Sequence, residues 1–101
     1  MKEPTFDSGG YPTDETLDAI RSWPYTDFPG LMRFVEEAVK GYGILRNTGG
    51  NTLELATGGW SGNESIVQAL HKNNMFIAMC WKSSHRGGLH IYEVPRFTTS
   101  T

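Results

Sequence analysis

The sequence predicts an α+β fold with two N-terminal helices and then a β-β-α-β-β order. The strands are expected to form an antiparallel four-stranded sheet with the helices on one face. Three observations lead to this prediction. Apolar residues recur at helical spacing in the first half of the chain, and turn-like segments separate short strand-like runs in the second half. The length of 101 residues is that of one domain.

The domain organisation follows from the composition along the chain. Residues 1–11 are polar and rich in Gly, so we expect a flexible arm. Residues 12–96 hold the helical and strand-like patterns and are expected to form a single α+β domain. Residues 97–101 contain only Thr, Ser and Phe, and we expect a frayed tail.

Two helices are predicted in the first half. Thr13 is the expected N-cap of the first helix, which Trp23 and Pro24 should end because the residue before a proline avoids the helical region. The second helix is expected to start near Thr26 or Asp27 and to stop at Gly41. Its buried face should carry the residues at a 3.6-residue period: Phe28, Leu31, Met32, Val35, Ala38 and Val39.

The second half predicts two hairpins around a third helix. Residues 44–46 and 52–56 are expected to pair across turn residues at 47–51. The third helix should begin at Ser61, whose spacing to Glu64 is that of a capping box, and should end at the Asn73-Asn74 pair.

The second hairpin is expected to follow that helix. The nearly continuous apolar run from 75 to 82 predicts a central strand, residues 83–88 a polar hairpin loop, and residues 89–94 the last strand. The predicted core joins two helices and the central strand: Leu31, Val35, Ile66, Leu70, Ile77 and Met79. The order of the strands in the sheet stays open at this point.

The composition excludes several classes of protein. Nine basic and eleven acidic residues leave a net charge of -2, which disfavours a nucleic-acid partner. A single cysteine excludes an intramolecular disulfide. The chain has no apolar run near the ~20 residues of a membrane helix and opens on no apolar segment, so we expect no membrane association and a cytoplasmic location.

The segment 57–64, Thr-Gly-Gly-Trp-Ser-Gly-Asn-Glu, is the most unusual of the chain. It precedes a predicted helix, whose free N–H groups would suit a phosphate or carboxylate beside Trp60. A purely structural interpretation is favoured, because Ser61 and Glu64 can cap the helix and the glycines can turn the chain. Glu64 would also repel an anion. The segment is neither a P-loop nor a dinucleotide-binding motif.

The histidines and the cysteine suggest little catalytic or metal chemistry. His71, Cys80, His85 and His90 lack the tight ligand spacing of a zinc site, so we predict no metal and no cofactor. A Cys80 nucleophile with His90 on a neighbouring strand is conceivable. A buried, unreactive thiol is the favoured interpretation. The sequence contains no recognisable catalytic constellation, which leans against an enzyme.

The predicted hairpin loop carries the best candidates for a binding surface. Arg86 and the neighbouring Trp81 are of the residue types that dominate protein–protein hot spots. Together with the Gly-rich loop they define the candidate binding residues: Trp60, Ser61, Asn63, Trp81, His85 and Arg86.

Part of the chain resembles a known group of proteins. The run 53–64, Met75-Phe76, Cys80-Trp81 and the Ser-Ser-x-Arg-Gly-Gly segment at 83–88 resemble small uncharacterised proteins of tailed bacteriophages and prophages. The resemblance covers about residues 43–94 and carries no known activity. It implies a location in the cytoplasm of a bacterial host cell and action on a host protein, because small phage proteins often act by binding, including inhibitors of host defence.

The functional expectation is therefore a small phage-encoded interaction protein that binds a bacterial host protein. The alternative is a small ligand-binding or catalytic domain that uses the Gly-rich loop 57–64. The two differ in one structural feature: whether this loop lines a concave pocket or packs closed against the sheet.

Overall fold

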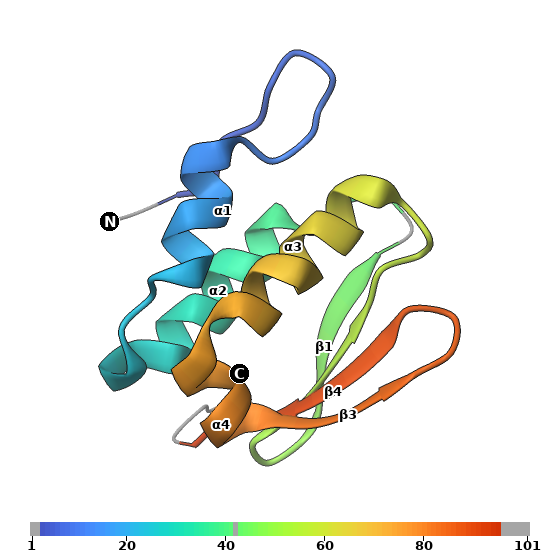
Figure 1. Cartoon of the computed structure of the whole chain (residues 1–101). Helices are drawn as coiled ribbons and strands as arrows, with labels where there is room; N and C mark the ends of the chain where they lie inside the picture. The colour runs from blue at the N-terminus through green and yellow to red at the C-terminus, as the bar shows by residue number, and fades with distance from the viewer. Residues whose placement is uncertain (1–2, 42, 96–101) are drawn as a thin grey trace.

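The computed structural model describes residues 3–41 and 43–95, and it confirms the α+β class with an antiparallel four-stranded sheet. Helices α1, α2 and α3 gather on one side of the sheet, and the short helix α4 adjoins the start of β3 (Figure 1). In chain order the elements are α1 (Asp14–Arg21), the 3-10 turn η1 (Tyr25–Asp27), α2 (Phe28–Ala38), β1 (Ile44–Gly49), β2 (Thr52–Ala56), α3 (Ser61–Lys72), α4 (Asn74–Cys80), β3 (Trp81–His85) and β4 (Leu89–Glu93).

The strand order is β1-β2-β4-β3, so the two hairpins meet at the centre of the sheet. The pairs Leu53↔Tyr92 and Leu55↔His90 define the register of β2 against β4. Because paired residues share a face, Leu53, Leu55 and Tyr92 lie together on the helix-facing side, where each is at most 2% exposed. This face of the sheet packs against the helices and forms one side of the hydrophobic core.

The outer face of the sheet points away from the helices. Ile44 pairs with Ala56 and lies on this face, where it is half exposed. Two ion pairs cross the strands here, Arg46–Glu54 at 3.2 Å and Lys82–Glu93 at 3.7 Å. Alternation of side chains thus separates an apolar inner face from a mixed outer face.

The core confirms most of the residues expected from the sequence. Leu31, Val35, Ile66 and Leu70 are fully buried. Aromatic rings link the helices to the sheet, because Phe76 lies edge-on to Phe28 at 5.3 Å and 5.0 Å from Tyr92 between ring centroids. Two residues expected in the core are not fully buried. Met79 is 44% exposed, so its prediction is wrong, and Ile77 is only partly buried.

The predicted central strand at 75–82 is wrong, because residues 74–80 form helix α4. Asn73 caps this helix through its side-chain oxygen, which accepts from the Phe76 N–H at 3.1 Å. Phe76 and Cys80, four residues apart, share the buried face, and Met75 points outward. A short, continuous apolar run can be a buried strand or a buried helix. It shows no apolar–polar alternation, which is the pattern that would distinguish a strand from a helix.

The hairpin that follows is correspondingly displaced. Strand β3 covers Trp81–His85, so the first half of the predicted loop at 83–88 is strand, and the turn is short. Gly87 and Gly88 adopt positive φ angles of 86° and 79°, which favour glycine in a tight turn. Strand β4 ends at Glu93, close to the expected end.

The helix ends test the capping predictions. Thr13 is the N-cap of α1, as expected, and accepts from the Thr16 N–H. Asp27 is the N-cap of α2 and accepts from the Gly30 N–H, which agrees with the helix start expected near this residue. Helix α2 ends at Ala38, before the expected stop at Gly41. The predicted capping box of α3 is wrong: Trp60 is the N-cap, no side chain caps the helix, and Ser61 is already its first residue.

The described part of the N-terminal segment folds back onto α1. The Thr5 N–H donates to Thr16 Oγ1 at 2.7 Å, and Phe6 forms a β-bridge with Pro12. Asp7 closes the intervening turn by accepting from the Tyr11 N–H at 3.0 Å. The expected frayed tail at 97–101 lies outside the described residues. In residues 3–41 and 43–95, no helix is long and apolar enough to cross a membrane.

Candidate functional site

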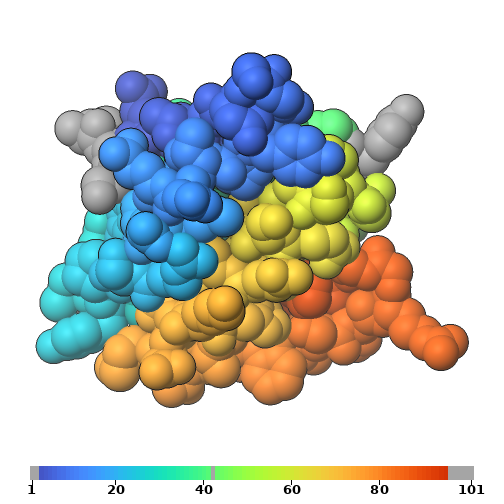
Figure 2. All heavy atoms as spheres, turned by 45° about the horizontal axis from the view of Figure 1, so that its top comes forward, coloured from blue at the N-terminus to red at the C-terminus, as the bar shows by residue number. Residues whose placement is uncertain are grey.

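The two loops singled out from the sequence lie at the same end of the sheet. The Thr57 N–H donates to the Gly88 carbonyl at 3.0 Å and joins the β2–α3 loop to the β3–β4 turn. Trp60 follows in this loop and contacts the Tyr11 ring at 5.0 Å between centroids. Arg86 begins the turn and is exposed. In the space-filling view the β3–β4 hairpin projects from the body of the protein (Figure 2).

Two of the predicted binding residues have structural roles. Asn63 is 1% exposed, and its side chain donates to the Lys40 and Thr57 carbonyls at 2.7 and 2.9 Å. It also accepts from the Lys40 N–H, so it ties α3 to the end of α2. The Ser61 hydroxyl bonds the Tyr11 hydroxyl at 3.2 Å on the surface. Asn63 is therefore not accessible to a partner.

The remaining predicted residues do not form one patch. Trp81 begins β3, whereas Arg86 follows its end, so the strand length separates them. His85 and Ser83 lie on the outer face, where their side chains bond at 2.9 Å. Trp81 and Ser84 face the helix side with their partners Tyr92 and His90.

A line of polar and aromatic side chains runs along α3 and the neighbouring strands β3 and β4. We call it the α3–β3 strip, and it consists of Glu64, His71, Trp81, Ser84 and His90. Its ring contacts run from His90 to His71 at 5.5 Å and from His71 to Trp81 at 6.2 Å. Glu64 and His71 are seven residues apart, which places both on one face of α3.

Hydrogen bonds within the strip fix the directions of its polar groups. The Trp81 indole N–H donates to Ser84 Oγ at 2.9 Å, and Ser84 Oγ lies 2.8 Å from His90 Nδ1. Because an indole N–H can only donate, the Ser84 hydroxyl proton is available to the unprotonated nitrogen of a neutral His90. His71 Nε2 bonds the buried Tyr92 hydroxyl at 3.1 Å.

The strip holds its imidazoles in the neutral form. Burial, followed by the charge of His90, lowers the pKa of His71 below its usual 6.5. Burial also lowers the pKa of His90; the Glu64 carboxylate opposes this effect and His85 adds to it. At neutral pH the strip therefore offers stacking surfaces and neutral hydrogen-bonding groups beside a single carboxylate.

The alternative nucleophile is poorly activated. Cys80 is 2% exposed in α4, and burial raises the pKa of its thiol to about 11. The thiol is therefore protonated at neutral pH, which suits a packed side chain rather than a nucleophile. Within the described parts of the chain, no group of three His, Cys, Asp or Glu side chains could hold a metal ion.

The Gly-rich loop packs closed against the hairpin turn. Thr57 is fully buried; its hydroxyl donates to Glu64 Oε2 at 2.5 Å and accepts from the Gly59 N–H at 3.3 Å. A side chain at Gly88 would clash with Thr57 Oγ1, so the turn lies directly on the loop. The Glu64 carboxylate thus sits against the loop where an anion would have to bind.

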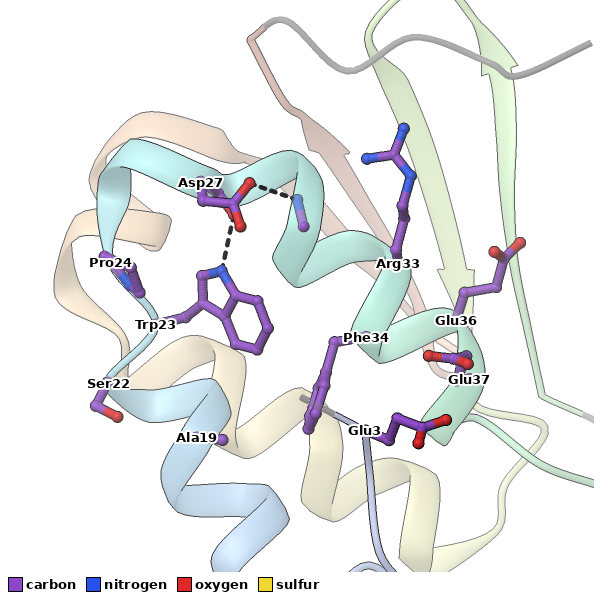
Figure 3. Close-up of a pocket in the computed structure, with 11 residues that line it drawn as sticks. Glu3, Ala19, Ser22, Trp23, Pro24, Asp27, Arg33, Phe34, Glu36 and Glu37 are labelled. Atoms are coloured by element: carbon purple, nitrogen blue, oxygen red, sulfur yellow. Dashed lines mark hydrogen bonds between the residues drawn. The ribbon is translucent and has the colours of Figure 1, made fainter. Parts of the chain in front are cut away.

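A groove opens elsewhere, between the end of α1 and the length of α2, with Glu3 of the N-terminal segment also in its lining. It encloses about 750 Å³ and includes Trp23 and Phe34 among its lining residues. Figure 3 shows these two rings facing the hollow. None of the binding residues expected from the sequence lines this groove.

The sequence reasoning missed His71 and Ser84 as site residues. His71 could have been found, because its spacing to Glu64 places both on one helix face. Ser84 could not, because its position opposite His90 depends on a strand that begins at Trp81 rather than at 75.

Comparison with known proteins adds no functional assignment. No protein-family model, no curated protein and no solved structure matches the chain.

Proposed function

We propose that the chain is a phage-encoded interaction domain that binds a bacterial host protein through the α3–β3 strip. The observation that carries the proposal is the state of Trp81. Its side chain is 45% exposed, yet its indole N–H is bonded to Ser84 and its ring contacts His71. A large exposed ring with a fixed orientation is typical of an interface anchor.

Fixing the indole before binding favours affinity. Tryptophan offers a large contact area at a low cost in conformational entropy, and it is among the residues that dominate hot spots. The Ser84 bond reduces that cost further, because the ring direction is selected in the free protein. A pocket on the partner would therefore bind a Trp81 side chain that is already in its bound orientation.

The surroundings of Trp81 suit a neutral, hydrogen-bonding partner surface. His71 and His90 are partly exposed and uncharged at neutral pH, so burying them in an interface requires no desolvation of charge. Arg86 at the far end of the hairpin adds a charged contact at the rim. The phage-like sequence pattern favours a host defence protein as the target, with inhibition as the outcome.

The alternative, a ligand-binding or catalytic use of the loop 57–64, has less support. Thr57 is fully buried and Glu64 is engaged with its hydroxyl, so the loop presents a closed surface. A binding role for the strip requires no rearrangement of this loop.

The proposal is tested by affinity capture from a bacterial host lysate with three immobilised proteins: the wild type, Trp81→Ala and Ile44→Ala. The last is the matched control, since it removes a half-exposed apolar side chain from the outer face of the sheet. Captured proteins are identified by mass spectrometry, and the affinity of the candidate target is measured with purified components.

We expect one target to be retained by the wild type and by Ile44→Ala and to be lost from Trp81→Ala. The purified complex should weaken by about 2 kcal/mol or more in Trp81→Ala. Equal affinity of all three proteins for every captured protein would refute the proposal, provided that circular dichroism shows each variant to be folded.

A further inference from the structure

The groove between α1 and α2 combines an aromatic floor with an acidic rim. Trp23 and Phe34 contribute the floor, with ring centroids 5.1 Å apart and planes inclined by 50°. The volume of about 750 Å³ falls within the range of ligand sites in proteins. The groove lies on the helical half of the molecule and includes none of the α3–β3 strip.

Local hydrogen bonds hold the floor in place. The Trp23 indole N–H donates to the Asp27 carbonyl at 2.8 Å, which fixes the ring beside the start of α2. The Asp27 carboxylate accepts from the Gly30 N–H at 3.1 Å (Figure 3). Phe34 is 3% exposed and is held by the core beneath it. The floor is therefore rigid before any ligand arrives.

The rim carries an excess of negative charge. Of the lining residues that the structure describes, four carry carboxylates, Glu3, Asp27, Glu36 and Glu37, and one carries a guanidinium, Arg33. In Figure 3 the Arg33 side chain extends away from the Trp23 ring, while Glu3 and Glu37 lie near Phe34. Among the described residues, no ion pair involves Glu3, Glu36 or Glu37. The site thus offers a cation both an aromatic face and carboxylates.

We propose that this groove binds an arginine-bearing segment of a partner protein, with the guanidinium over Trp23. A planar guanidinium stacks on an aromatic ring and pairs with carboxylates at the same time. A neutral apolar segment would leave the carboxylates beside it without compensation. The inference is independent of the strip, since the two surfaces share no residue.

The probe is the peptide acetyl-Gly-Arg-Gly-Arg-Gly-amide, and its control replaces each arginine by citrulline. Citrulline keeps the shape of the side chain and removes the charge. Binding is followed in nitrogen–proton correlation spectra of the full chain. The chain has three tryptophans. The indole signal of Trp23 therefore reports on the groove, and those of Trp60 and Trp81 report on surfaces outside it.

We expect the arginine peptide to shift the Trp23 indole signal and to leave those of Trp60 and Trp81 in place. The citrulline peptide should bind more weakly by about threefold or more. The variant Glu36→Gln/Glu37→Gln should weaken the arginine peptide by a similar factor. The matched control Glu54→Gln/Glu93→Gln removes two carboxylates from the outer face and should leave binding unchanged.

Three results would overturn the inference. The first is an unmoved Trp23 signal at saturating arginine peptide, and the second is equal binding of the citrulline peptide. The third concerns the chain itself, whose residue 96 is an arginine outside the described residues. A Trp23 signal that moves in Arg96→Gln without any peptide would identify the chain's own end as the occupant.

Discussion

The Thr57 N–H donates to the Gly88 carbonyl at 3.0 Å, and through this bond the loop before α3 and the turn of the second hairpin form one unit. The bond lies beyond the last β2–β4 pair, Ala56↔Leu89, and extends the central ladder into both loops. The position of the projecting hairpin relative to α3 therefore depends on this contact.

Substitution of Gly88 should weaken that unit. In Gly88→Ala the new methyl group would clash with Thr57 Oγ1, and the φ of 79° adds backbone strain. Gly87→Ala is the matched control, because Gly87 has a similar φ of 86° and open space around it. We expect Gly88→Ala to lower the free energy of unfolding by about 1–3 kcal/mol more than Gly87→Ala. Urea denaturation measures both, and equal values would contradict the contact.

Thr57, rather than Ser61, should stabilise the start of α3. Thr57→Val removes the bonds to Glu64 Oε2 and the Gly59 N–H while keeping the shape, and we expect a loss of about 1–3 kcal/mol. Ser61→Ala removes only a surface bond to Tyr11 and should change stability by about 0.5 kcal/mol or less. A larger loss in Ser61→Ala than in Thr57→Val would restore the capping box.

Asn73 should be among the most sensitive polar residues. It is 4% exposed, caps α4, and donates from Nδ2 to the carbonyls of Ile20 and Trp23 at 3.0 and 3.1 Å. Asn73→Ala loses the cap and both bonds to these carbonyls, so we expect a loss of about 2–4 kcal/mol. Asn74→Ala, at an exposed neighbour, is the control for thermal or chemical unfolding. A loss below about 1 kcal/mol in Asn73→Ala would argue against these bonds.

The core is tested by two apolar substitutions. Leu70→Ala truncates a fully buried side chain and should cost about 2–5 kcal/mol. Met79→Ala truncates a side chain that is 44% exposed and should cost less than about 1 kcal/mol. Comparable losses in the two variants, measured by chemical denaturation, would favour the strand first expected at 75–82.

The strip should make stability depend on pH. The folded-state pKa values of His71 and His90 lie below the ordinary 6.5, so the unfolded chain binds more protons in the interval below 6.5. Stability should therefore be constant just above that pH and fall as the pH is lowered through it. The charged groups acting on His90 are Glu64 and His85, and Glu64 moderates the effect.

This dependence is measured by urea denaturation between pH 5 and about 7.5. The double variant His71→Gln/His90→Gln should show a flatter profile than the wild type over that interval. His85→Gln is the comparison on the outer face and should retain most of the slope. An unchanged slope in the double variant would show that other groups are responsible.

The sequence predicted the elements with a strong local signal and failed where the signal was ambiguous. Thr13 was identified as a cap, and the start of α2 near Asp27 was predicted, because a side-chain oxygen before a periodic apolar pattern has few other roles. Helix α4 was missed because Phe76 and Cys80 lie within an apolar run that suits a strand equally well. Asn73, an N-cap residue type directly before that run, was the available signal.

The candidate site was predictable only in part. Trp81 could be chosen from its residue type, but its neighbours depend on the displaced strand that places Ser84 opposite His90. The groove could not be predicted, because Trp23 lies in the segment after α1 and meets Phe34 of α2 only in the folded chain. Such contacts arise from tertiary packing rather than from local sequence.

The strand order β1-β2-β4-β3 also sets the time at which the fold can be completed during synthesis. Strand β2 finds its second hydrogen-bonding neighbour only in β4, after α3, α4 and β3 have been made. Until residue 93 has left the ribosome, Leu53 and Leu55 lack Tyr92 and His90 beside them, and one edge of the first hairpin stays unpaired. The nascent chain must therefore hold a half-built sheet until the final strand closes it.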